Sequence, residues 1–304
     1  MASWQVRLTN AALRVAVKPT WRAGLDVSSV RRRVAVLDWV LSRGDGPRGT
    51  PVVAGGVPAT WVGAGGRTML YLHGGGFCLH LPNVYRLFGA RLGGLTGARV
   101  LLPEYRLAPE HPYPAAVDDC IVAYRWLVED EGVDPGSIAV VGDSAGAYLV
   151  LATLLRARDA GLAAPGCAVL MSGGYELTFD DPSMRYNRRR DPLFNTTAFP
   201  FLRRCYLPDG DPTDPAVSPL RGDFHNLPPL LFQVGSTEML LDQSVRAAER
   251  ARAAAVEVTL EVHPGAPHVF QAVPWLPETG VALNSLTAFV TAHTVAPTVI
   301  LPGR

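Results

Sequence analysis

Apolar residues occur along most of the chain either in short continuous runs or at a helical period over longer segments. Short apolar runs bounded by Gly and Pro are typical of strands, and longer periodic segments are typical of amphipathic helices. We predict eight strands, at residues 51–54, 59–62, 68–72, 99–102, 138–141, 168–172, 230–234 and 256–262. Helices are predicted at residues 4–17, 27–41, 85–95, 115–131, 145–160, 243–255 and 280–293.

The alternation of strands and helices through the later part of the chain predicts an α/β fold. Its near-continuous apolar strands indicate a mostly parallel sheet that is covered by helices on both faces. Residues 178–226 break the alternation, because they are rich in Asp, Pro, Arg and aromatic residues and are too long for a plain connection. We therefore expect N-terminal helices at 1–45 that form part of a cap, a main α/β domain at 46–177 and 227–304, and a cap insertion at 178–226.

The composition excludes several classes of protein. Hydrophobic residues make up 48% and charged residues 18% of the 304 positions, so a disordered chain is excluded. Lys and Arg total 28 against 27 Asp and Glu, and this balance predicts neither a nucleic-acid partner nor an anionic membrane. Arg7, Arg14 and Lys18 interrupt the apolar positions of the first twenty residues, and long apolar stretches are absent from the sequence. We expect a soluble, cytoplasmic protein.

The cysteines carry no recognisable pattern. They are widely separated and form neither a C-x-x-C pair nor a cluster with histidines at zinc-finger spacing. The sequence thus predicts neither a disulfide scaffold nor a structural metal site, and we interpret all four as free, mostly buried thiols. They are Cys78, Cys120, Cys167 and Cys205.

A G-x-S-x-G pentapeptide at 142–146 follows a predicted strand and begins a predicted helix. Gly142 and Gly146 relieve crowding where a strand turns sharply into a helix, and the helix N-terminus favours negative charge nearby. Ser144 is therefore the candidate nucleophile. The alternative is a serine that merely caps the helix.

A second glycine motif, H-G-G-G-F at 73–77, ends the strand predicted at 68–72. Consecutive glycines let backbone N–H groups approach a bound oxygen closely, which suits an oxyanion hole. The alternatives are a flexible turn or a phosphate-binding loop, although the Lys-Ser/Thr pair of a phosphate loop does not follow. The predicted donors are the amides of Gly74, Gly75, Gly76 and Ala145.

With a third motif, Y-R-L-A-P-E-H-P-Y-P-A-A at 105–116, the chain resembles the hormone-sensitive lipase-like branch of the α/β-hydrolase superfamily, the bacterial family IV esterases. The resemblance covers roughly residues 45 to 295. It implies the α/β-hydrolase fold, an eight-stranded mostly parallel sheet with flanking helices and a helical cap. It also implies a Ser-Asp/Glu-His triad that works without a metal or an organic cofactor.

The chain order of this fold, Ser then acid then His, limits the remaining candidates. Glu238 lies in the position of the acid, in a loop that resembles the family's, and Asp242 is its rival four residues on. His268 lies in a turn-rich loop after the last predicted strand, where the family keeps its base. His263 competes with it but belongs to the strand end, from which Ser144 is harder to reach.

These residues predict a serine-dependent carboxylesterase that hydrolyses short- to medium-acyl esters, including aryl esters, through an acyl-enzyme on Ser144. A lactone or N-acetyl amide hydrolase with the same triad stays open, because the choice of bond depends on the pocket. A non-catalytic ligand receptor, as in the plant gibberellin receptors, is a third possibility. The expected partner is a small-molecule ester, and the apolar strand at 256–262 suits pairing in a homodimer.

Overall fold

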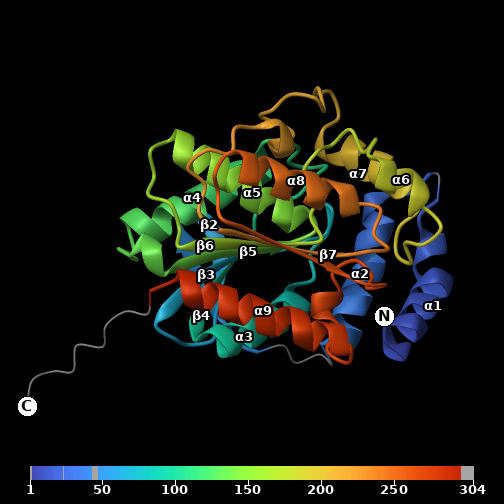
Figure 1. Ribbon diagram of the computed structural model, residues 1–304, viewed down its shortest axis with the longest axis horizontal. Helices are drawn as coiled ribbons and strands as arrows, with labels where there is room; N and C mark the ends of the chain where they lie inside the picture. The colour runs from blue at the N-terminus through green and yellow to red at the C-terminus, as the bar shows by residue number, and fades with distance from the viewer. Residues whose placement is uncertain (1, 23, 43–46, 296–304) are drawn as a thin grey trace, which may run out of the picture.

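An eight-stranded sheet forms the centre of the computed structural model, which describes residues 2–22, 24–42 and 47–295 (Figure 1). The strands run in the order β1-β2-β4-β3-β5-β6-β7-β8 across the sheet. β1 and β2 are antiparallel to their neighbours, and all other neighbouring pairs are parallel. The strands are β1 Thr50–Ala54, β2 Val57–Val62, β3 Arg67–Leu72, β4 Ala98–Pro103, β5 Ile138–Asp143, β6 Cys167–Met171, β7 Leu230–Gly235 and β8 Val258–His263.

Helices cover both faces of the sheet because successive side chains of its buried strands point to opposite sides. In β3, Met69 and Tyr71 pack with α3 and α9, whereas Leu70 and Leu72 pack with α4, α5 and α8. Figure 1 shows these two helical layers below and above the sheet. Their bounds are α3 Pro82–Thr96, α4 Ala115–Glu129, α5 Ala145–Asp159, α8 Leu241–Ala253 and α9 Pro277–His293.

The N-terminal helices and the first part of the segment 178–226, which contains α6 and α7, lie together at one end of the molecule (Figure 1). The ammonium group of Lys18 donates to the carbonyls of Arg188 (2.8 Å) and Asp191 (2.6 Å), and the Asn195 amide donates to the carbonyl of Trp21 (2.7 Å). The elements here are α1 Trp4–Ala16, η1 Lys18–Thr20, α2 Val27–Leu41, α6 Pro182–Tyr186 and α7 Ala198–Tyr206. Later in the insertion, η3 Pro219–Arg221 packs against α5 and α8. The predicted boundary between residues 45 and 46 lies outside the described residues.

The helix α1 also contacts the C-terminal part of the chain. The Asn10 amide donates to the carbonyl of Gly265 (2.9 Å), which belongs to the loop after β8. Ser3 donates through both its backbone N–H and its hydroxyl to the carboxylate of Glu278 in α9. The first helix therefore braces the loop that follows the last strand.

The predicted eight-stranded, mostly parallel sheet is confirmed, although several bounds differ: β2 begins at Val57 and β8 at Val258, where the predictions were residues 59 and 256. α3 begins at Pro82 and α9 at Pro277, three residues before the predicted starts, because proline is well suited to the first turn of a helix. Apolar periodicity did not reveal α6 and α7 within the insertion. In the described ranges, every helix is too short or too polar to cross a lipid bilayer.

Candidate active site

Ser144 lies in the sharp turn between β5 and α5, with φ 52° and ψ −120°. A non-glycine residue adopts this conformation only when its surroundings enforce it. Here the two flanking glycines make the turn possible. A Cβ atom on Gly146 would lie 1.9 Å from the carbonyl oxygen of Leu72, and one on Gly142 would lie 2.6 Å from the backbone of Gly146. Backbone atoms thus pack so closely around this turn that positions 142 and 146 have no room for a side chain.

The side chains of Ser144, His268 and Glu238 form a continuous chain of hydrogen bonds. The Ser144 hydroxyl lies 2.8 Å from Nε2 of His268, and Nδ1 of His268 lies 2.7 Å from Oε2 of Glu238. With Glu238 ionised, Nδ1 carries the proton and Nε2 is free to accept one from the hydroxyl. Glu238 is completely buried and His268 is 8% exposed.

The pKa of His268 lies above its usual value of 6.5. Burial is the largest influence and lowers this pKa, because it disfavours the imidazolium. The hydrogen bond to Glu238 and the charges of Glu238, Asp191 and Asp143 act in the opposite direction and together outweigh it. The surroundings therefore favour the imidazolium that forms when His268 accepts a proton.

Glu238 is fixed by donors on its second oxygen. Oε1 accepts hydrogen bonds from the backbone N–H of Gly235 (2.5 Å) and the hydroxyl of Ser172 (2.8 Å). The Ser172 oxygen in turn accepts from the backbone N–H of Val269 (3.0 Å), next to His268. Ser172 thus links Glu238 to the loop after β8 that bears His268, which we call the histidine loop. Sequence analysis missed it, because a serine at a strand end carries no motif.

The glycine loop after β3 places free amides beside Ser144. Gly75 has φ 113° and Gly76 has φ 59°, so the loop needs glycine at both positions. Among the described residues, the amides of Gly75, Gly76 and Ala145 have no hydrogen-bond partner. The amide of Gly74 differs, because it donates to the Asp143 carboxylate (3.0 Å). We therefore remove Gly74 from the predicted oxyanion donors.

Asp143, the neighbour of Ser144, is a buried acceptor that fixes the glycine loop. Besides the Gly74 amide, it accepts the hydroxyls of Tyr71 (2.6 Å) and Tyr85 (3.1 Å). Burial raises the pKa of Asp143, and these three donors together with the positive charge of His268 partly offset that rise. The carboxylate therefore holds the loop against the turn that bears Ser144.

The two rival residues lie elsewhere. Asp242 accepts the backbone N–H of Ser183 (2.7 Å) and the hydroxyl of Tyr186 (2.6 Å), both in the insertion 178–226. The ring of His263 packs on Phe270, with ring centroids 4.7 Å apart. Both side chains are engaged outside the hydrogen-bonded chain of Ser144.

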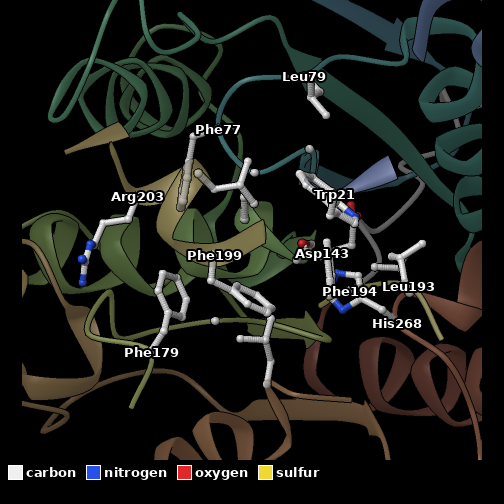
Figure 2. Close-up of a pocket in the computed structure, with 18 of the residues that line it drawn as sticks. Trp21, Phe77, Leu79, Asp143, Phe179, Leu193, Phe194, Phe199, Arg203 and His268 are labelled. Atoms are coloured by element: carbon white, nitrogen blue, oxygen red, sulfur yellow. Dashed lines mark hydrogen bonds between the residues drawn. The ribbon is translucent and has the colours of Figure 1, made fainter. Parts of the chain in front are cut away.

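A cavity of about 260 Å³ opens in front of Ser144 and is lined almost entirely by apolar side chains. Figure 2 shows His268, Phe194 and Trp21 at one end and Phe77, Phe179 and Arg203 at the other. The remaining lining residues are Gly75, Gly76, Leu79, Tyr85, Asp143, Ser144, Ala145, Gly174, Leu177, Leu193, Phe199, Leu202, Leu240 and Val269. Aromatic residues of the insertion divide between roles: Phe194 and Phe199 line the cavity, whereas Tyr206 is buried in the core.

The insertion is clamped onto the loop that bears Glu238. The amide of Asn187 donates to the carbonyl of Glu238 (2.8 Å). The buried carboxylate of Asp191 accepts the N–H of Met239 on one oxygen and those of Leu193 and Phe194 on the other, all at 2.9 Å. Phe194 then packs edge-on against the ring of His268, with centroids 4.9 Å apart. Sequence analysis missed Asn187 and Asp191.

Comparisons with known proteins agree with this geometry. Residues 69–272 match the family described as alpha/beta hydrolase fold. An acetyl-hydrolase of Streptomyces hygroscopicus is 40% identical over 252 residues, which are 82% of this chain and 84% of that protein. An esterase of Acinetobacter venetianus is 33% identical over 95% of this chain and 97% of its own length.

A solved structure extends the likeness to three dimensions. The crystal structure of an esterase from the bacterial hormone-sensitive lipase family superimposes with a TM-score of 0.87 and 33% sequence identity. The match covers 97% of this chain and all of the other. The chain therefore belongs to the α/β-hydrolase family, and within it to the hormone-sensitive lipase-like esterases.

Proposed function

We propose that the chain is a serine carboxylesterase that hydrolyses short- to medium-acyl esters through an acyl-enzyme on Ser144. The observation that carries the proposal is the unbroken hydrogen-bonded chain from Ser144 through His268 to Glu238, beside three amides without partners. A nucleophile, a base and an oriented acid in this order are what acyl transfer needs.

In the first half of the reaction, the Ser144 oxygen attacks the ester carbonyl while Nε2 of His268 accepts its proton. Glu238 stabilises the imidazolium and keeps the ring in the orientation that faces the hydroxyl. The imidazolium then donates the proton to the departing alcohol, which leaves an acyl group on Ser144. In the second half, His268 takes a proton from water, and the resulting attack releases the acid and restores the serine.

The amides of Gly75, Gly76 and Ala145 are the proposed oxyanion donors. Negative charge develops on the carbonyl oxygen in the tetrahedral intermediate, and each preorganised donor contributes roughly 3 to 4 kcal/mol to its stabilisation. Two of these amides come from the glycine loop and one from the N-terminus of α5, where the helix dipole adds to the effect.

The cavity supports a small acyl group. Its volume of about 260 Å³ lies at the lower end of small-molecule sites, and its apolar lining suits an alkyl or aryl chain. The acetyl-hydrolase among the relatives agrees with this size class. We propose that the helices within 1–45 and the insertion 178–226 form the cap over this cavity, as their mutual contacts at Lys18 and Asn195 suggest.

Location and assembly are proposed on separate grounds. All four cysteines are free, which supports the reducing environment of the cytoplasm. The strand β8 is an edge of the sheet, and Val262 in it is 42% exposed. We propose this edge as the contact of a homodimer.

The experiment is a series of p-nitrophenyl esters from acetate to palmitate, with lactones and N-acetyl amides alongside. We expect kcat/KM to be highest for acetate and butyrate, to fall steeply for long chains and to be unchanged by a chelator. Ser144→Ala is expected to reduce kcat about a millionfold while the protein stays folded. Undiminished turnover by a folded Ser144→Ala protein would refute the mechanism, and a preference for amides or lactones would refute the substrate class.

A further inference from the structure

Two thiols meet where the glycine loop touches the insertion. Cys78 ends the H-G-G-G-F-C segment, and Cys205 lies in the last turn of α7. The two side chains lie close enough for each thiol to be the largest influence on the pKa of the other. Neither side chain has a part in the proposed hydrolysis, so this contact between two distant parts of the chain needs its own explanation.

Close packing on both sides of the pair keeps the thiols together. The rings of Phe77 and Tyr206, the sequence neighbours of the two cysteines, are stacked with centroids 3.8 Å apart and planes 12° from parallel. Leu202, one turn earlier in α7, packs so closely on Gly76 that a Cβ there would lie 2.6 Å from its side chain. Figure 2 shows Phe77 and Arg203 of α7 at the same end of the pocket. The glycine loop and α7 thus pack against each other at the position of the two cysteines.

The two thiols differ in exposure and acidity. Cys205 is partly exposed, whereas Cys78 is fully buried. The side-chain contact with Cys78 lowers the pKa of Cys205 to about 7. The partial burial of Cys205 opposes this shift, whereas the charges of Arg204 and Arg31 lower the pKa further. The contact with Cys205 and the burial of Cys78 both raise the pKa of the Cys78 thiol. A partly exposed thiol with a low pKa is the one that oxidants attack, and a buried thiol beside it is placed to resolve the product.

We propose that Cys78 and Cys205 are a modification site at which hydrogen peroxide forms a disulfide, and that this bond lowers the turnover of the enzyme. The Cys205 thiolate attacks the peroxide oxygen, which gives a sulfenic acid and releases water. The Cys78 thiol then attacks the sulfenic sulfur, so that the S–S bond forms and a second water leaves. The two sulfurs lose two electrons in total, and these reduce the peroxide to water.

The disulfide acts on the oxyanion donors through the backbone. Cys78 is two residues from Gly76, and its amide closes the glycine loop by donating to the carbonyl of Gly75 (3.1 Å). The sulfurs must approach to about 2 Å when the bond forms. This movement displaces the loop and α7 relative to each other, and donors that are misplaced by a fraction of an ångström stabilise the oxyanion less.

The test treats the reduced full-length protein with hydrogen peroxide. We expect a loss of two free thiols, a Cys78–Cys205 peptide in a non-reduced digest and a fall in kcat for p-nitrophenyl acetate of about tenfold. A dithiol should restore both thiols and turnover. Cys205→Ser and Cys78→Ser should lose the cross-link and the peroxide-dependent fall. Cys120→Ala, which removes a buried thiol from α4, should behave like the wild type.

Two results would overturn the proposal: oxidation of Cys205 to sulfinic acid without the cross-link, or a cross-link that leaves kcat unchanged. The activity measurement rests on the proposed esterase function, whereas the cross-link does not. A reduced protein that hydrolyses no ester would contradict the esterase assignment, and the digest would still decide whether the thiols pair.

Discussion

The two sides of the cavity are built by different means. On the sheet side, the turn at Ser144 and the glycine loop are shaped by backbone atoms that approach too closely for a side chain, as at Gly146. On the insertion side, the wall is held by buried polar side chains that bind distant backbone groups, as Asp191 binds the amide of Met239. The groups of the proposed reaction therefore lie on the sheet side, and the insertion side supplies part of the cavity wall in front of them.

Because of this difference, the two sides should respond differently to amino-acid substitution. The sheet side tolerates almost no alteration at its glycines, because the main chain itself occupies the space. The insertion side depends on a few hydrogen bonds to buried groups, and each of these can be removed singly. Substitutions on the two sides should therefore differ in size and in kind.

After Ser144→Ala, the largest expected effect lies on the sheet side, at Glu238→Gln. The amide cannot stabilise the imidazolium by charge, so we expect kcat to fall about 10³- to 10⁴-fold. Because His268 must be neutral to accept a proton, kcat/KM of the wild type should rise with pH through a pKa above 6.5. The variant loses the acid that raises this pKa, and its inflection should move to lower pH. A pH profile of both proteins checks the direction, and an unmoved inflection would contradict the role of Glu238.

Asp191→Asn tests the insertion side and should have a smaller effect. An Asn side chain has one acceptor oxygen and cannot accept the Met239 amide together with those of Leu193 and Phe194. The free energy of unfolding should fall by about 1 to 3 kcal/mol because a buried group stays unpaired. We expect kcat/KM to fall about tenfold, since Phe194 no longer holds the ring of His268.

The control for Asp191→Asn is Asp242→Asn. Asp242 also binds the insertion, through Ser183 and Tyr186, but it does so away from the imidazole. Denaturant unfolding and p-nitrophenyl butyrate kinetics on both variants separate the two effects. If Asp242→Asn lowers kcat/KM as much as Asp191→Asn, the clamp acts by general stability and not by positioning His268.

The smallest expected change comes from Trp21→Ala, on the N-terminal part of the cavity wall. Trp21 packs on Phe194, with centroids 5.6 Å apart, and its removal enlarges the cavity. The ratio of kcat/KM for octanoate to that for butyrate should rise about fourfold, because burial of one further methylene contributes roughly 0.8 kcal/mol. Trp39→Ala, at an exposed position in α2, should leave the ratio unchanged. An equal shift in both variants would place Trp21 outside the acyl site.

The sequence allowed the sheet side to be predicted in detail. Ser144, Gly75 and Gly76 belong to sequence motifs in which local backbone geometry requires the glycines, whereas Glu238 and His268 were predicted from the resemblance to the esterase family and the chain order of its fold. The structure brings these residues together. The exception is Gly74, because the acceptor of its amide, the Asp143 carboxylate, lies 69 residues away in sequence.

The insertion side could not be predicted in the same way. Asn187 and Asp191 act through hydrogen bonds to the backbone of Glu238 and Met239, and any residue could supply such backbone groups, so the sequence does not identify these partners. The proximity of Cys78 and Cys205 could not be predicted for a similar reason, because the positions of free cysteines in a sequence do not indicate the distance between their side chains. Such contacts depend on tertiary structure alone, and only coordinates reveal them.

The contact of Asn10 with Gly265 has a consequence for biosynthesis. During synthesis α1 leaves the ribosome well before its docking partners in the loop after β8 and in α9. Until these partners are made, the apolar residues of α1 stay exposed to solvent. Val6, which is fully buried in the folded protein, packs on residues of that later part of the chain such as Ala266 and Phe270. The loop that bears His268 therefore gains this support only after chain segments 255 residues apart have both been made.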